Sequence, residues 1–221
     1  MPADVLPGYT WSARAGRYRA NATGRFVARR DILGLLDGQV NDAGRRLGDL
    51  TTALHEGRIA PSVWADQMQT ELRRLHSQNR ALAVGGWDRM THADWGAVGG
   101  RLRGDYARVT RLAEDIQAGR VTLPQALVRV DGYIGSARLQ FWHGERGRAA
   151  GETGTASIEI RTLGMAEHCQ DCVDYHARGW CMAGELPPPG EGSECGIHCR
   201  CTMGVRSVPV AELGQWLGTR R

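Results

Sequence analysis

The stretch THADWGAVGGRLRGDYARVTRLAEDIQAG, residues 91–119, carries the clearest structural pattern of the chain. Its apolar residues recur every three or four positions, which predicts an amphipathic helix with one buried face. This face consists of Trp95, Val98, Leu102, Tyr106, Val109, Leu112 and Ile116. Thr91 followed by Asp94 is typical of a helix start, and Gly119 suits the position just after a helix end. A long helix therefore organises the middle of the chain.

The same helical period extends over residues 31–146 and predicts further helices. One apolar face ends before Gly57, a second follows Pro61, and a third starts at Thr122 and Pro124. Proline suits the first turn of a helix, and glycine suits its end. By contrast, residues 157–162 alternate apolar and polar side chains, which predicts a short strand.

The composition is that of a globular protein. Of the 221 residues, 42% are hydrophobic and 24% are charged, close to the usual values. No run approaches the roughly 18 apolar residues of a membrane helix, and the first 30 residues lack the apolar core of a secretory signal. We therefore expect neither a membrane segment nor export. All 28 basic residues are arginine, which excludes Schiff-base chemistry and a P-loop lysine.

All six cysteines lie in one tract, spaced Cys169-x2-Cys172-x8-Cys181-x13-Cys195-x3-Cys199-x-Cys201. A Cys-x2-Cys turn places two thiolates on one side of a tight knuckle, and a second pair further along completes a tetrahedral zinc site. We predict a structural zinc ion bound by Cys169 and Cys172 together with two of Cys195, Cys199 and Cys201.

The choice of the second pair stays open. Cys199 and Cys201 are two residues apart, so binding by both requires a bend in the chain. Cys195 combined with either of them is sterically easier. Six cysteines also permit disulfides, but the prediction of a chain that is not exported favours a metal site.

The remaining polar and thiol groups of the tract are not expected to bind the ion. Cys181 is predicted to be a small buried thiol. His168 and His176 are predicted to lie at the surface or beside the site. A nucleophilic cysteine would need a paired histidine in the right geometry, which the adjacency of His198 and Cys199 does not supply.

These patterns divide the chain into five segments and give a fold class. We predict a basic N-terminal arm (1–30), a helical domain (31–146), a linker (147–156), a Cys-rich zinc module (157–208) and a tail (209–221). The fold is therefore predicted to be mainly α with a small irregular zinc-binding β module at the C-terminus, which makes the protein α+β.

The arm combines a hairpin pattern with a strong positive charge. A turn at Asn21-Ala22-Thr23-Gly24 separates two similar short runs, residues 16–18 and 24–26, which predicts a small hairpin. Six arginines face the single acid Asp4: Arg14, Arg17, Arg19, Arg25, Arg29 and Arg30. Two interpretations stay open. The arm is either a solvated segment packed on the body along one edge, or it contacts nucleic acid or an acidic partner.

The C-terminal tract resembles the signature of tailed-phage head-morphogenesis (minor head) proteins, the Mu F-like group. The resemblance rests on His168-Cys169-Gln170-Asp171-Cys172, Gly179-Trp180, Leu186-Pro187-Pro188-Pro189-Gly190 and Cys195-x3-Cys199-Arg200-Cys201-Thr202. It is strong over residues 165–203. Looser similarity precedes it, at Gly24–Val27 and at Arg129, Tyr133, Arg138 and Phe141.

The resemblance implies a structural role. Such proteins are present in few copies in the procapsid, are associated with the portal and support head assembly. The implied partners are the portal and capsid proteins, with packaged DNA as a further candidate partner of the arginine-rich arm. The implied location is the virion, or the host cytoplasm during assembly. Many members carry His-Pro-Asn where this chain has Gly196-Ile197-His198, which implies that Cys195 replaces a histidine ligand.

The sequence bears on two other classes of function, nucleic-acid binding and catalysis. A nucleic-acid-binding zinc-ribbon protein is the alternative, although two arginines face six acids in residues 167–201, and a net acidic module suits phosphate poorly. The chain contains no HExxH, no GxSxG and no deaminase signature. We therefore predict that the protein is not an enzyme.

Overall fold

The fold was analysed in a computed structural model, which describes residues 5–150 and 153–219. The chain forms two compact units, Met1–Gln140 and Phe141–Arg221. Long helices dominate, and the strands form two small antiparallel sheets, so the predicted α+β class is confirmed. Residues 1–4 of the predicted arm, 151–152 of the linker and 220–221 of the tail lie outside the described residues.

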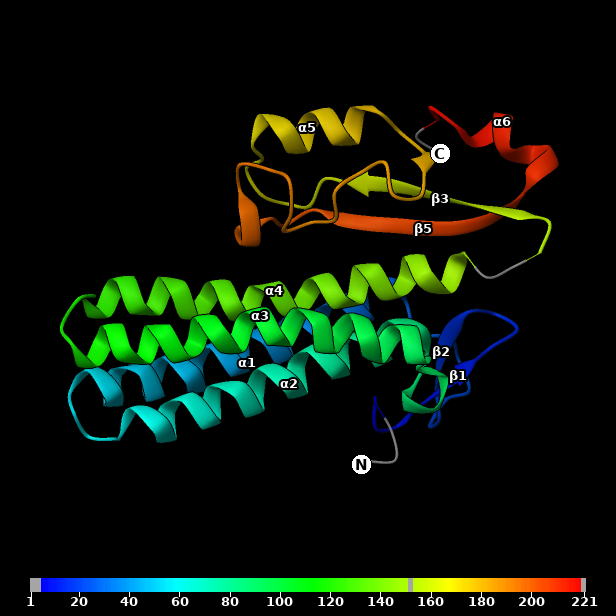
Figure 1. The fold of residues 1–221 in the computed structure, drawn as a ribbon. Helices are drawn as coiled ribbons and strands as arrows, with labels where there is room; N and C mark the ends of the chain where they lie inside the picture. The colour runs from blue at the N-terminus through cyan, green and yellow to red at the C-terminus, as the bar shows by residue number, and fades with distance from the viewer. Residues whose placement is uncertain (1–4, 151–152, 220–221) are drawn as a thin grey trace. The chain divides into compact units, whose positions relative to one another are not determined.

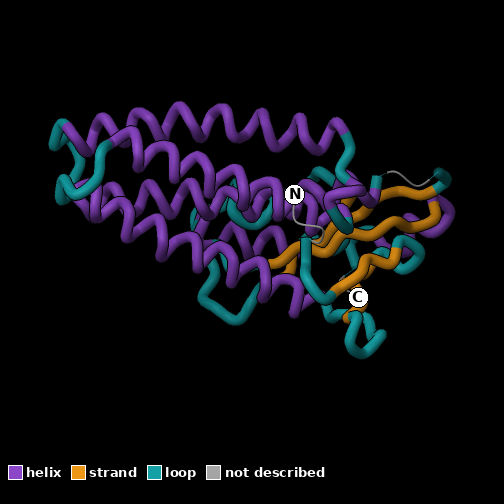
Figure 2. The backbone as a smooth tube through the Cα atoms, turned by 90° about the horizontal axis from the view of Figure 1, so that it is seen from below, coloured by secondary structure: helices purple, strands orange, loops and turns teal. Residues whose placement is uncertain are grey.

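Four long helices form the first unit. They are α1 (Arg29–His55), α2 (Pro61–Val84), α3 (His92–Gln117) and α4 (Leu123–Ala149), the last of which continues into the second unit. The helices lie side by side in both views, joined by short loops (Figures 1 and 2). A single 3₁₀ turn, η1 (Trp87–Arg89), connects α2 and α3. No helix of the described residues is long and apolar enough to cross a membrane.

The helix boundaries follow the predicted capping residues. The Thr91 hydroxyl accepts a hydrogen bond from the Asp94 amide, and the Asp94 carboxylate accepts one from the Thr91 amide, forming a capping box. Thr122 and Gln125 form the same reciprocal pair before α4. Pro61 occupies the first turn of α2. These local signals depend on neighbours three residues apart, which is why the sequence places them correctly.

The helices share one apolar core. Its buried members come from all four: Val40, Ala43, Leu47, Leu54, Trp64, Met68, Leu72, Leu75, Val98, Leu102, Val109, Leu112, Ala113, Ile116, Ala126, Val130, Ile134 and Ala137, with Val121 from the loop before α4. Trp95 departs from the predicted face, since 37% of its surface is exposed. Its ring stacks instead on Trp87, with ring centroids 6.1 Å apart.

A hairpin precedes the helices. Strands β1 (Tyr9–Ser12) and β2 (Arg17–Ala20) pair antiparallel. The predicted turn at residues 21–24 is present, with the Gly24 amide bonded to the Ala20 carbonyl, but the pairing beyond it is a single bridge between Arg19 and Phe26. The longer hairpin is therefore formed by residues 9–20, which precede the predicted turn, because β1 supplies an alternating strand that pairs with β2.

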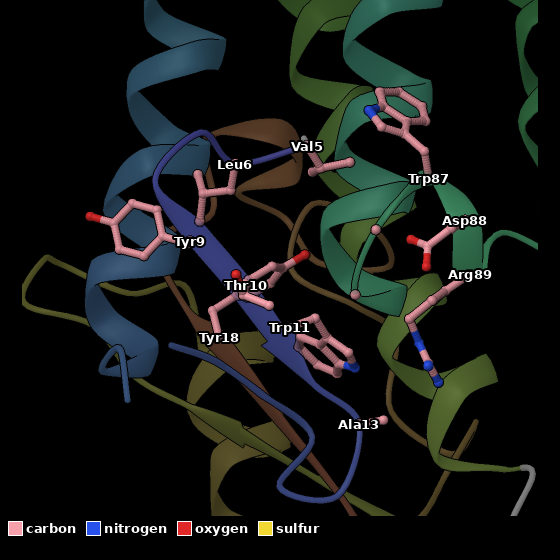
Figure 3. Close-up of a pocket in the computed structure, with 12 residues that line it drawn as sticks. Val5, Leu6, Tyr9, Thr10, Trp11, Ala13, Tyr18, Trp87, Asp88 and Arg89 are labelled. Carbon is pink, nitrogen blue, oxygen red and sulfur yellow. The ribbon is translucent and has the colours of Figure 1, made fainter. Parts of the chain in front are cut away.

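One face of this hairpin packs on the helical body. The Tyr18 hydroxyl donates a hydrogen bond to the Leu82 carbonyl at 2.9 Å, and the Trp11 ring lies so close to Gly85 that a Cβ there would meet it at 2.5 Å. A pocket of about 340 Å³ opens between β1 and η1, with Trp87, Asp88 and Arg89 on its far side (Figure 3). The arm is therefore a folded part of the first unit.

A three-stranded sheet forms the centre of the second unit. Its order is β4 (Cys181–Met182), β3 (Thr155–Thr162), β5 (Thr202–Pro209), all antiparallel. Around it lie α5 (Gln170–Ala177), two 3₁₀ turns, η2 (Gly196–His198) and η3 (Val210–Glu212), and α6 (Leu213–Trp216). Ile158 and Ile160 pack with Trp180 and Val208 on one face.

The unit includes segments that we expected to be linker and tail. Helix α4 runs to Ala149 and β3 starts at Thr155, so both ends of residues 147–156 are regular structure. Trp216 of the expected tail packs on the sheet core, and the Trp180 amide donates to the Thr219 carbonyl at 2.9 Å. An ion pair anchors the end of α4 here: Arg146 holds the fully buried Glu159, whose carboxylate also accepts the Leu186 amide.

A buried polar cluster interrupts the helical core. His76 has no exposed surface, and its Nε2 lies 3.4 Å from Asp105 Oδ2 and 3.5 Å from Ser136 Oγ. Both neighbours approach the same ring nitrogen, unlike a nucleophile–base–acid triad, in which they occupy opposite nitrogens. Burial, aided by Arg101 and opposed by Asp105, lowers the pKa of His76 to about 4.

Acidification should destabilise the first unit through His76. Its pKa of about 4 in the folded state lies below the ordinary value of 6.5, so the unfolded chain binds the proton first. Stability is therefore expected to fall as the pH drops from 6.5 toward 4, by at most about 1.4 kcal/mol per pH unit. Urea unfolding followed by circular dichroism measures this slope. His76→Gln should flatten it, and the exposed His92→Gln should not; equal slopes in both variants would contradict the assignment.

Candidate metal centre

Five of the six cysteines converge at one end of the sheet. The Sγ atoms of Cys169 and Cys195 are 3.5 Å apart, those of Cys172 and Cys195 are 3.4 Å apart, and those of Cys172 and Cys199 are 3.6 Å apart. Two groups have all their sulfurs within 4.8 Å of one another, Cys169–Cys172–Cys195 and Cys172–Cys199–Cys201. Cys172 belongs to both and is the centre of the cluster.

The first two thiols are placed by the start of α5. Cys169 is the N-cap residue, and its carbonyl accepts hydrogen bonds from the Cys172 and Val173 amides, which closes the knuckle that the Cys-x2-Cys spacing predicts. Cys172 lies in the first turn and has no exposed surface. The N-terminal end of a helix favours negative charge, which suits a thiolate.

The other three thiols come from irregular chain. Cys195 precedes η2, and Cys199 and Cys201 lie between η2 and β5, outside any strand. The sulfurs of Cys199 and Cys201 nevertheless lie within 4.8 Å of each other, so both could bind one ion. The structure accordingly brings all five predicted candidates together and leaves the choice of four among them open.

A buried guanidinium touches the sulfurs. Arg161 on β3 has no exposed surface, and its Nη2 lies 3.0 Å from Cys199 Sγ and 3.4 Å from Cys172 Sγ. Its Nη1 donates to the Pro187 carbonyl at 2.8 Å, and its plane lies over the Tyr175 ring. Among the described residues no carboxylate pairs with it. Since arginine stays charged in proteins, the sulfurs have to supply the counter-charge.

The thiol pKa values diverge across the cluster. Burial raises the pKa of Cys172 and of Cys195 to about 12. Burial also acts on Cys199, but the hydrogen bond from the Cys201 amide and the charge of Arg161 outweigh it and lower its pKa to about 7. An ion that binds Cys172 or Cys195 therefore has to displace the proton of that thiol at neutral pH.

The donor set fits a tetrahedral metal ion. The cysteines are free thiols, and their separations exceed the roughly 2.05 Å of a disulfide bond. Metal–sulfur bonds of about 2.3 Å in a tetrahedron would separate the sulfurs by about 3.8 Å, close to the contacts above. A metal ion at this position would connect the start of α5 with the segments that carry Cys195 and Cys199–Cys201, which hydrogen bonds such as that from the Glu194 amide to Asp171 already link in part.

The other candidate ligands lie outside the two groups. Cys181 is buried on β4, paired across from Glu159. His198 is exposed on η2. His176 Nδ1 contacts the Arg161 carbonyl at 2.9 Å. His168 lies beside the cluster, with Nδ1 3.6 Å from Cys201 Sγ and Nε2 2.8 Å from the Gly164 carbonyl.

Sequence reasoning missed Arg161. It alternates with Ile158 and Ile160 on β3, on the same side as Glu159, which is the pattern of a solvent-facing strand side. The only sequence signal for a buried arginine was that two residues of opposite charge, Glu159 and Arg161, occupy alternating positions of the strand. Their burial depends on loops that come later in the chain, so no local pattern reports it.

Replacing the central thiol should abolish metal binding. Cys172→Ala removes the sulfur that both groups share, and we expect loss of bound metal and a melting temperature that chelator no longer changes. Cys181→Ala is the matched control and should keep both properties. Elemental analysis, thiol titration and thermal melts with and without chelator provide the readouts. Full metal content in Cys172→Ala would show that the ion binds elsewhere.

Arg161 should tune metal affinity without being a ligand. Arg161→Met removes the charge beside Cys199 and Cys172, and we expect metal binding weaker by about 10- to 100-fold, as for other groups that support ligands. Competition with a chromophoric chelator measures the affinity. The visible bands of the Co²⁺-loaded protein should stay those of a thiolate site. Arg178→Met, which removes an exposed arginine near Glu185, should leave the affinity unchanged, and equal affinity in both variants would rule out this role.

Comparison with known proteins assigns no function to this cluster. No protein-family model, no curated protein sequence and no solved structure matches the chain. The function is therefore inferred from the cysteine cluster, the buried arginine beside it and the sequence resemblance of the tract.

Proposed function

We propose that this protein is a minor structural component of a tailed-phage head, which supports assembly at the portal and capsid proteins. The observation that carries the proposal is the convergence of the residues of the resemblance. The five cysteines come from two parts of the tract, Cys169–Cys172 and Cys195–Cys201, and form one cluster in space. When the cysteines of a sequence signature come together in space, a shared metal-binding module explains them better than chance spacing does.

We propose zinc as the ion. The donors are thiols, which favour soft or borderline ions, and a structural zinc site takes four ligands in tetrahedral geometry. Four thiolates fill every position and leave none for a substrate or water, which suits a structural ion. In this role the free energy of metal binding becomes folding free energy of the loops that carry the ligands.

The proposed role is assembly rather than catalysis. The module would act in the virion, or in the host cytoplasm while heads are assembled, and the helical unit would supply surface for protein partners. The zinc-ribbon alternative is less well supported. The cysteine tract is rich in acids, and its Arg178 lies 3.7 Å from a carboxylate oxygen of Glu185, so little positive charge is left for phosphate.

Co-expression with the portal and major capsid proteins of the same phage tests the proposal. We expect the chain to sediment with particles in a density gradient, at a few copies per particle by quantitative mass spectrometry, and only when the portal protein is present. This dependence follows from a portal-associated role.

Two variants separate the module from the rest of the chain. Cys172→Ala should reduce incorporation into particles because the metal module is lost, and Cys181→Ala should not. The proposal would be overturned if portal and capsid proteins assembled while the unchanged chain stayed at the top of the gradient.

A further inference from the structure

The N-terminal hairpin has two chemically different faces. Cross-strand pairing places Trp11 opposite Tyr18, and these side chains pack toward Leu82 and Gly85 of the helical body. Side chains alternate between the faces of a strand, so Arg17 and Arg19 project from the opposite side of β2. The hairpin therefore turns its aromatic residues inward and its arginines outward.

An exposed phenylalanine holds the two outward arginines together. Phe26 bridges to Arg19 and so lies on the same face. The guanidinium carbon of Arg19 is 4.8 Å from the centre of its ring, and that of Arg17 is 5.2 Å away. Arg17 also donates to the Val27 carbonyl at 3.3 Å. Phe26 keeps 40% of its surface exposed, and its packing with the two guanidiniums reduces the side-chain entropy that a ligand would otherwise have to remove.

The described residues of the arm carry positive charge and no negative charge. Residues 5–30 contain six arginines and no acidic residue. In the part of the chain that the structure describes, no carboxylate pairs with Arg17 or Arg19. Two other exposed arginines differ, as Arg45 on α1 pairs with Asp42 and Arg58 in the loop after α1 pairs with Glu56. The outer face of the hairpin thus carries an excess of positive charge, on guanidinium groups that Phe26 already holds in place.

We propose that this face binds the phosphodiester backbone of nucleic acid, with Arg17 and Arg19 on phosphates and Phe26 as the residue that positions them. Guanidinium forks match phosphate oxygens bidentately. Arginines at alternating strand positions form a regular row, and nucleic acid presents a regular row of phosphates. An acidic protein surface offers no such repeat. The inference goes beyond the proposed head-assembly role and does not depend on it.

Fluorescence anisotropy with labelled DNA tests this site on the full chain. Duplex and single-stranded oligonucleotides of one length are titrated between 50 and 200 mM salt, because phosphate contacts make the affinity fall with salt by a logarithmic slope of about 0.9 per phosphate for duplex DNA and about 0.7 for single strands. Arg17→Gln/Arg19→Gln should lower the slope for duplex DNA by about 1.8. Binding of duplex or of single strands supports the phosphodiester assignment and identifies the source.

Matched variants distinguish the face from total charge. Arg45→Gln/Arg58→Gln removes an equal number of charges from α1 and the loop after it, and should leave the slope unchanged. Phe26→Leu should weaken binding at every salt concentration while keeping the slope, because the arginines remain but lose their support. Absence of DNA binding at 50 mM salt, equal slopes in the two double variants, or tighter binding of a polyglutamate peptide than of DNA would each overturn the proposal. None of these outcomes bears on incorporation into heads.

Discussion

The charge of Arg161 constrains the second unit more than any other group does. A guanidinium stays ionised in a protein interior, and burying it without a counter-charge costs several kcal/mol. The neighbouring buried acid on the same side of β3, Glu159, is held by Arg146. The sulfurs of Cys172 and Cys199 lie within 3.4 Å of Arg161, so the side chain is stable there only if the cluster carries negative charge.

A metal–thiolate centre, for which five cysteines lie close together, would meet this requirement. Four thiolates around a divalent ion carry two net negative charges, and one guanidinium cancels half of them. The chain between β3 and β5 contains only α5, a two-residue strand and one 3₁₀ turn, too little regular structure to bury a core of its own. An ion bound by four of these thiols would cross-link this segment where apolar packing is sparse.

The first unit is stabilised in a different way. Its helices bury a continuous apolar core and need no cross-link. Within it, His76 and Asp105 are fully buried polar residues, and Asp105 pairs with Arg101 and Arg108 as well as approaching His76. The hairpin adds Trp11 and Tyr18 to the body and leaves its arginines outside. The first unit thus has a packed apolar core and a hairpin with outward arginines, and the second unit has a cluster of five cysteines.

Much of this organisation follows from sequence alone, for a physical reason. Helix periodicity, the capping pair at Thr91 and Asp94 and the Cys-x2-Cys knuckle are local signals, and local geometry realises them: the long helices, the α+β class and the five candidate thiols are where the patterns place them. The burial of Arg161 and the approach of His168 to Cys201 arise from contacts between distant segments. Such contacts depend on which loop covers which strand, and only the tertiary structure decides that.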